Sequence, residues 1–357
     1  MLEFVDKVHR RGHKVSVFLG SFQKRFNYQY INDDVDFYFP PTWDALSKIT
    51  GTPYPVFKGV EGWLKQLAPD VVHINSHLFL SNYQVARAAR SLRIPFVVTV
   101  HGFAVRRGFI IDKLQYVYLQ TIARFLFNMA SRVICLTETE AVSVAEVIGG
   151  TAKISVIPNG VNVDFFRPPD EKDSNLVVWV GRMVPEKGLV YLLEAMREVV
   201  KHHADVKLVL VGDGPLKNDL SNFVYKKNLQ KNVIFFGVRS HEEVSAILSK
   251  SSIFVFPSLK EGLPRAVLEA MACGTVVVGA NVSGVKDIIT HEHNGILIPP
   301  RDPKVLANYI VTLLNDENLR QFLGQNARQL MVENYNWDMI TRKIERVYFD
   351  SVDGKTE

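Results

Sequence analysis

The sequence predicts two doubly wound α/β domains of Rossmann-like type that face each other across a cleft. Short, β-branched, continuously apolar runs alternate with longer amphipathic stretches, as expected for buried parallel strands and the helices that cover them. This alternation occurs twice along 357 residues, a length that suits two or three domains. With 47% hydrophobic and 22% charged residues, the composition is that of a globular protein rather than a disordered one.

Ten apolar runs are candidate strands, five in each half of the chain. Those of the first half are 14–19, 70–75, 95–100, 132–137 and 154–159, and those of the second are 175–181, 206–212, 232–237, 252–257 and 275–280. The segment 158–175 is rich in Pro, Asn and Asp, which is typical of a linker. We therefore expect a first domain over 1–165, a second over 166–336, and a last amphipathic helix over 337–352.

Charge and composition narrow the class of protein. The charged N-terminus is unlike a secretory signal, and no apolar stretch is long enough to span a bilayer, so we expect a cytoplasmic protein. Cys135 and Cys273 stand in apolar surroundings and are expected to be buried and reduced. Residues 1–165 hold 18 Lys and Arg against 13 Asp and Glu, whereas residues 166–357 hold 24 of each.

The basic first half leaves peripheral contact with the inner face of a membrane open. A strongly apolar stretch over 117–130, near Arg106, Arg107 and Lys113, points the same way, although packing on a sheet explains it as well. Nucleic acid is not an expected partner, because no basic cluster is interleaved with aromatic residues.

The loop in VVWVGRMVPEKGLVYLL is a candidate anion site. A buried strand ends at Gly181, Arg182 follows in the turn, and Lys187 stands near the start of the next helix. Exposed backbone amides and the helix dipole attract anions at such a position. Arg182 and Lys187 would then neutralise a diphosphate leaving group, although two solvated loop cations are an equally good interpretation.

A pair of carboxylates follows another strand, in FPSLKEGLPRAVLEAMACG. Glu261 lies in the loop after the strand, and Glu269 lies in the second turn of a helix that Pro264 starts. Carboxylates accept hydrogen bonds from sugar hydroxyls. The apolar neighbours of Glu269 favour a functional group, because a carboxylate is unusual in such company. Glu261 is explained as well by a favourable place near the helix dipole.

His101 and Gly102 come directly after a strand of the first domain, so His101 is a candidate contact for a sugar or phosphate. His291 and His293 flank a turn, without further ligands for a metal. The GDGP sequence over 212–215 lacks the third glycine of a dinucleotide fingerprint, which indicates a tight turn.

These elements, in this order, resemble the retaining glycosyltransferases of the GT-B fold, in particular family 4 (glycosyl transferases group 1). Glu261 and Glu269 with EGLPRAVLEAMACG match that family's E-x7-E motif, and GRMVPEKG, PNGVNVDFF, VGDGPLKNDL and VTVHG match its other landmarks. The resemblance covers nearly the whole chain. It implies transfer of a hexose from a nucleotide diphosphate sugar, most commonly a UDP-sugar, to a glycan, lipid-linked or small-molecule acceptor, without a metal or other cofactor.

The resemblance also implies a role for each matching residue. Glu269 would bind the ribose and Glu261 the donor hexose, while Arg182 and Lys187 would hold the diphosphate beside Gly181. The remaining implied contacts are backbone at Gly262 and Leu263 to the sugar and phosphates, backbone at Val238 to the base, and His101 to the donor sugar. The helix over 337–352 would cross back to complete the first domain.

The chain departs from the family pattern at its start. Family members have a strand and a Gly-rich loop before the helix that ends in a phrase like RRGHKV, whereas Met1 stands inside that helix. A misplaced start and a truly shortened first domain both explain this. The alternatives to an active transferase are a non-catalytic paralogue or partner subunit, and another GT-B enzyme such as a nucleotide-sugar epimerase or a phosphorylase.

Overall fold

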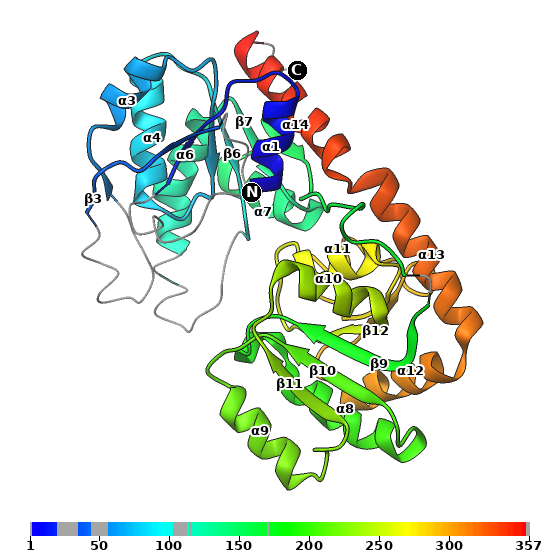
Figure 1. Ribbon diagram of the computed structural model, residues 1–357. Helices are drawn as coiled ribbons and strands as arrows, with labels where there is room; N and C mark the ends of the chain where they lie inside the picture. Colours follow the sequence, from blue (N-terminus) through cyan, green and yellow to red (C-terminus); the bar gives the residue numbers. More distant parts are fainter. Residues whose placement is uncertain are drawn as a thin grey trace. The chain divides into compact units, whose positions relative to one another are not determined.

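The computed structural model describes residues 2–19, 35–43, 56–102, 113, 116–169 and 171–354. The chain forms two compact units (Figure 1). Unit 1 consists of Met1–Pro158 and Trp337–Glu357, and unit 2 consists of Asn159–Asn336. No helix among the described residues is long and apolar enough to cross a bilayer. Both units are built on parallel sheets with helices, so the predicted α/β class is confirmed.

Unit 2 is a six-stranded parallel sheet with helices on both faces. The strands lie in the order β11-β10-β9-β12-β13-β14, and every neighbouring pair is parallel. The elements are β9 (Asp173–Val180), η3 (Pro185–Lys187), α8 (Leu189–His202), β10 (Lys207–Val211), α9 (Lys217–Lys226), β11 (Val233–Gly237), α10 (His241–Lys250), β12 (Ser251–Phe256), α11 (Arg265–Ala272), β13 (Val276–Ala280), β14 (Ile296–Ile298), α12 (Pro303–Asn315) and α13 (Glu317–Asn334).

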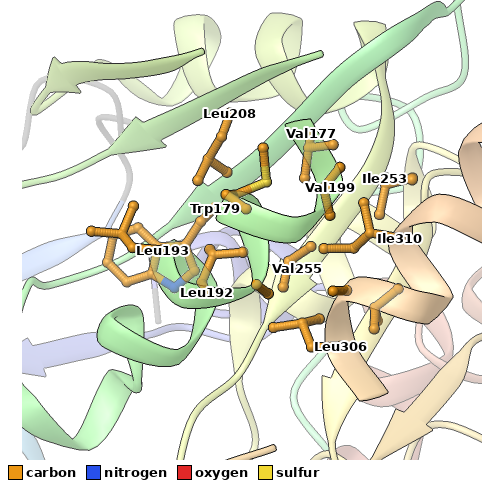
Figure 2. Packing of buried hydrophobic residues seen from close by; sticks show 14 of the residues in the cluster. Val177, Trp179, Leu192, Leu193, Val199, Leu208, Ile253, Val255, Leu306 and Ile310 are labelled. Carbon is orange, nitrogen blue, oxygen red and sulfur yellow. The ribbon is translucent and has the colours of Figure 1, made fainter. Parts of the chain in front are cut away.

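Alternate side chains of the strands of unit 2 enter two separate cores. Val177 and Trp179 of β9 point to the face covered by α8, α9 and α12, and Figure 2 shows Trp179 against Leu192 and Leu193 of α8. Val178 points to the opposite face, which α10, α11 and α13 cover. Both faces of each inner strand are therefore apolar, which explains why these strands read as continuous hydrophobic runs.

The boundary between the units falls after Pro158, whereas the sequence prediction puts it after residue 165. Residues that follow Pro158 pack on unit 2: Phe166 is buried in its core, and the Val161 amide donates to the Tyr335 carbonyl at 2.7 Å. Arg328 donates to the carbonyls of Val163 and Phe166, both at 2.8 Å. The Pro- and Asn-rich composition indicates that the chain passes from one unit to the other in this segment, but it does not predict the contacts that assign 159–165 to unit 2.

Lys172 fastens the start of β9 to the amino-terminal edge of the sheet. Its ammonium donates to the carbonyls of Ser249, Ser251 and Cys273 and to the hydroxyl of Thr275, at 2.7 to 3.2 Å. Burial lowers the pKa of Lys172 to about 8. The bonds of this one side chain reach β12 and the segments before β12 and β13, so it fixes their starting points relative to β9.

Unit 1 contains a four-stranded parallel sheet in the order β5-β6-β7-β8. A parallel pair, β1-β2, and an antiparallel pair, β3-β4, are separate from it among the described residues. The elements are α1 (Leu2–Arg10), β1 (Ser16–Phe18), β2 (Asp36–Tyr38), β3 (Thr42–Trp43), β4 (Val56–Phe57), α3 (Val60–Leu67), β5 (Val72–Asn75), α4 (Leu80–Ser91), β6 (Phe96–Thr99), the π-helical turn η2 (Leu119–Ala123), α6 (Arg124–Met129), β7 (Arg132–Cys135), α7 (Glu138–Ile148), β8 (Ile154–Val156) and α14 (Trp337–Val352).

The C-terminal helix α14 belongs to unit 1. Its residues Trp337, Ile340 and Ile344 pack on Val97 of β6 and Ile134 of β7. The other face of this sheet is covered by α4, α6 and α7. Helix α14 also lies against α1 (Figure 1). Directly after α1, the guanidinium of Arg11 donates hydrogen bonds to Glu345 of α14.

His73 links β5 to α14 through both nitrogens of its ring. One nitrogen is bonded to the hydroxyl of Tyr348 and the other to the hydroxyl of Thr99 at 2.6 Å. Because hydroxyls both donate and accept, this arrangement is complete with a neutral imidazole. Desolvation lowers the pKa of His73 to about 3, so the ring stays neutral in the folded chain well below its ordinary pKa of 6.5.

This shift predicts that unit 1 loses stability as the pH falls from about 6.5 toward 3. In that window the unfolded chain binds a proton at His73 and the folded chain does not, so acid favours unfolding by up to about 1.4 kcal/mol per pH unit. The His73→Gln variant cannot titrate, and its amide can still bond both hydroxyls. We expect urea unfolding of this variant to depend less on pH than unfolding of the wild type. A His202→Gln control, changed at an exposed site of unit 2, should keep the wild-type slope, and equal slopes in all three proteins would contradict the prediction.

Candidate functional site

The sheet of unit 2 reverses its strand order between β9 and β12. From β9 the chain proceeds outward through β10 to β11, and from β12 it proceeds in the opposite direction through β13 to β14. The loops that leave the carboxyl ends of β9 and β12 therefore diverge over neighbouring strands. In open α/β sheets this is where ligands bind. The predicted donor residues fall on these two loops, on α11, and after β11.

An ion pair joins the two loops. Lys187, the last residue of η3, donates to the Oε1 atom of Glu261 at 2.6 Å. The side chains are largely buried, with 22% of Lys187 and 10% of Glu261 exposed. The Lys187 ammonium also lies 5.2 Å from the centre of the Phe256 ring at the end of β12. The sequence predicted both charged residues at the site but not that they pair with each other.

Backbone contacts hold the same two loops at short range. The Leu259 amide donates to the Glu186 carbonyl at 2.8 Å. Gly188 has a φ of +65°, and a Cβ atom there would lie 2.2 Å from the Pro257 carbonyl oxygen. Gly284 has a φ of +82°, and a Cβ atom there would lie 1.6 Å from the carbonyl oxygen of Gly262. Only glycine fits at either position, so the loop after β12 is fixed from both sides.

Glu269 is buried in α11, in the apolar surroundings that the sequence indicates. Its carboxylate lies 3.6 Å from the guanidinium of Arg265, one turn earlier in the same helix. Arg182, by contrast, is exposed after β9. The sequence prediction missed Arg265, although the i, i+4 spacing of opposite charges on a helix was a signal for this pair.

The third loop of the candidate site follows β11. Val238 is exposed directly after this strand, where the resemblance places the nucleotide base. The guanidinium of the next residue, Arg239, lies 4.4 Å from the centre of the Phe236 ring. His241, which begins α10, stacks on Phe165 with ring centres 4.9 Å apart and planes inclined by 11°. Arg239 and His241, which follow β11, therefore stack on the rings of Phe236 and Phe165, and the sequence prediction named none of these contacts.

In unit 1, His101 directly follows β6. Its Nε2 atom lies 3.3 Å from the side-chain oxygen of Asn75, the last residue of β5. Desolvation lowers the pKa of His101 from its ordinary value, which favours a neutral imidazole at pH 7. Ser76, which directly follows the end of β5, has a φ of +84°, which is rare outside glycine and common at functional sites.

Glu140 ties the His101 turn to the end of β7. Its two carboxylate oxygens accept hydrogen bonds from the amides of Gly102 and Leu136, both at 2.8 Å. The side chain is buried, and its own amide donates to the Thr137 hydroxyl at 3.1 Å. The spacing of Thr137 and Glu140 is that of a capping box, so the sequence signals a helix start here. The spacing of Thr137 and Glu140 did not predict the hydrogen bond from Gly102 to Glu140.

The structure places Gly181, Arg182, Lys187, Glu261, Gly262, Leu263 and Glu269 on two neighbouring loops and one helix of unit 2, and places Val238 after β11 of the same unit. His101 belongs to unit 1. Among the residues that the structure describes, no group of three or more His, Cys, Asp and Glu side chains could hold a metal ion.

Comparison with known proteins accounts for both halves of the chain. Residues 1–165 match the family described as Glycosyltransferase Family 4, and residues 162–330 match the family described as Glycosyl transferases group 1. A UDP-Gal:alpha-D-GlcNAc-diphosphoundecaprenol alpha-1,3-galactosyltransferase of Escherichia coli is 32% identical over 349 residues, which are 91% of this chain and 87% of that protein. The phosphatidylinositol N-acetylglucosaminyltransferase gpi3 subunit of Schizosaccharomyces pombe is 24% identical, over 96% of this chain and 74% of that one.

Solved structures share the fold over almost the full length. Sucrose-phosphate synthase from Thermosynechococcus elongatus gives a TM-score of 0.80 at 22% identity, covering 99% of this chain and 92% of that one. HepE from Anabaena, in complex with UDP and glucose, gives 0.77 at 21% identity, covering 98% and 95%. These matches and the two Rossmann-like units confirm the resemblance that the sequence indicates: the chain belongs to the family 4 glycosyltransferases, which have the GT-B fold and transfer sugars from nucleotide-sugar donors.

Proposed function

We propose that this protein transfers a hexose, with retention of configuration, from a UDP-sugar to a lipid-linked or other glycan acceptor. The observation that carries the proposal is the ion pair between Lys187 and Glu261 at the point where the sheet of unit 2 reverses its order. The donor named for the Escherichia coli relative is UDP-Gal, and its acceptor is a sugar on a lipid diphosphate. These two names support a UDP donor and a lipid-linked acceptor here.

In this proposal, Lys187 and Arg182 bind the donor diphosphate. A lysine ammonium has three donors, and Glu261 takes one of them, so two remain for phosphate oxygens. Arg182 supplies a second, exposed cation from the same loop. Glu269 lies on α11, the helix that follows the loop of Glu261, and would accept hydrogen bonds from the ribose hydroxyls. The remaining oxygen of Glu261 would accept one from a hydroxyl of the hexose.

The reaction we propose breaks the bond between the sugar C1 atom and the diphosphate oxygen. The acceptor oxygen attacks C1 from the same face, and its proton passes to a leaving phosphate oxygen. Lys187 and Arg182 stabilise the negative charge that develops on the diphosphate, which is the largest contribution expected of such a site. No covalent intermediate and no metal ion is part of this proposal. For His101 of unit 1, the proposal keeps the role that the resemblance implies, a contact with the donor sugar.

Titration calorimetry with uridine, guanosine and adenosine diphosphates tests the donor site. We expect uridine diphosphate to bind and the Glu269→Ala variant to bind it about 10- to 100-fold more weakly, because a charged hydrogen bond contributes about 1.5–3 kcal/mol. Glu194→Ala removes an exposed carboxylate from α8 and should leave the affinity unchanged. If guanosine or adenosine diphosphate bound instead of uridine diphosphate, the proposed base would be wrong and would be replaced by the one that binds. If none of the three diphosphates bound, the proposed donor site would be contradicted.

Replacing Lys187 with Met should lower kcat by roughly two to three orders of magnitude, as expected when a group that stabilises leaving-group charge is lost. Steady-state transfer from UDP-galactose, with product detected by mass spectrometry, measures this. Lys217→Met removes a lysine from the exposed ion pair with Asp213 and is the matched control.

The Lys187→Met variant also leaves Glu261 without its partner in a largely buried place. The double variant Lys187→Met, Glu261→Gln removes that charge. If its turnover returned to the wild-type value, Lys187 would serve only to neutralise Glu261, and its role at the diphosphate would be wrong.

Replacing Glu140 with Gln should lower kcat by about tenfold or more without weakening uridine diphosphate binding. Gln keeps one acceptor oxygen, but its amide nitrogen cannot accept from a backbone amide, so one of the two bonds is lost and the His101 turn is no longer tied to the end of β7. Glu138→Gln changes an exposed carboxylate of the same helix and is the control. A lower melting temperature with unchanged kcat would show that Glu140 only stabilises unit 1.

A further inference from the structure

The surface formed by α4 and by residues 116–129 of unit 1 exposes several large apolar side chains. The exposed fractions are 64% for Tyr116, 57% for Val117 and 47% for Phe125. The ring of Phe125 contacts that of Tyr83 on α4, with centres 5.9 Å apart, so the two helices share this surface. Clustered exposed apolar side chains are typical of a protein or membrane contact. We call this surface the aromatic patch.

The two segments that form the aromatic patch also carry exposed arginines. On α4, Tyr83, Arg87 and Arg90 stand three and four residues apart and therefore share one side of the helix. On α6, Arg124 precedes Phe125. Arg87, Arg90 and Arg124 are all exposed. Neither α4 nor the segment 116–129 contains an Asp or Glu, so no acidic side chain of these elements opposes the arginines.

The sequence extends this asymmetry beyond the patch itself. Between Val71 and Thr137 the chain has one acidic residue, Asp112, and eight basic ones. Arg106 and Arg107, which the sequence analysis associates with a membrane contact, are among the eight and lie outside the described residues. Exposed aromatic side chains and arginines on the same elements, without acidic residues, match the chemistry of an anionic bilayer surface, where rings enter the headgroup region and arginines bind phosphates.

We propose that the aromatic patch binds the surface of a membrane that contains anionic phospholipids. Tyr116, Val117 and Phe125 enter the headgroup region, and Arg87, Arg90 and Arg124 bind the lipid phosphates around them. The proposed function supplies the reason for such a contact, a lipid-linked acceptor, and the inference rests on it to that extent. The binding itself needs no sugar donor, so it is measured separately from transfer.

Flotation of the full chain with phosphatidylglycerol–phosphatidylcholine vesicles tests the proposal. We expect binding to these vesicles, little binding to pure phosphatidylcholine, and release by high salt. Arg87→Glu with Arg124→Glu should weaken binding by roughly tenfold or more, because each basic residue near an anionic surface contributes roughly fivefold. Tyr116→Ser with Phe125→Ser should weaken it without changing its salt dependence.

Matched controls are made on unit 2. Arg197→Glu with Lys226→Glu reverses two exposed charges there, and Tyr225→Ser with Phe322→Ser removes two exposed rings. Both should bind vesicles like the wild type, and equal losses in controls and patch variants would overturn the proposal. The proposal would also be overturned if the chain bound uridine diphosphate but no anionic vesicles. That result would leave the proposed function intact. A dimer in size-exclusion chromatography that Phe125→Ser dissociates would also overturn it, by assigning the patch to a second copy.

Discussion

The contact between Lys187 and Glu261 is the constraint on which the candidate site depends. Two chain crossovers start from neighbouring strands and run in opposite directions, so nothing in the sheet itself holds their first residues together. The ion pair does this at 2.6 Å, supported by the bond from Leu259 to Glu186. A largely buried pair of this kind adds little net stability, because desolvation opposes the attraction. Its effect is to fix one arrangement of the two loops.

The charges of the site are already arranged before any donor arrives. Lys187 is paired with Glu261, and Arg265 is paired with Glu269. Arg182, after β9, has no oppositely charged partner among these four residues. In the proposed function, a diphosphate would meet one exposed cation and one whose remaining donors are held in place. Side chains that need not reorganise stabilise developing charge more effectively than mobile ones, which is the advantage of pairing the residues in the free protein.

Local patterns predicted most of the fold and the segments on which the candidate site residues lie. All ten apolar runs contain a strand, and Glu269 is buried where its apolar neighbours suggested. The short strands β2, β3, β4 and β14 have two or three residues each, too few for a periodic signal. Contacts between distant residues were also beyond prediction: Lys187 with Glu261, and Glu140 with Gly102, each join segments far apart in the sequence. Their geometry depends on the strand order, which no local pattern contains.

The membership of α14 in unit 1 affects how the chain is made. Unit 2 is one continuous segment, Asn159–Asn336, whereas unit 1 receives its last helix from Trp337 onward. During synthesis the ribosome therefore completes unit 2 first, while Val97 and Ile134 still lack the apolar cover that α14 provides. Domains generally fold as units, with the N-terminal one first. Here the N-terminal unit is the last to be finished, and its sheet is exposed to chaperones and to aggregation for the time that 178 residues take to translate.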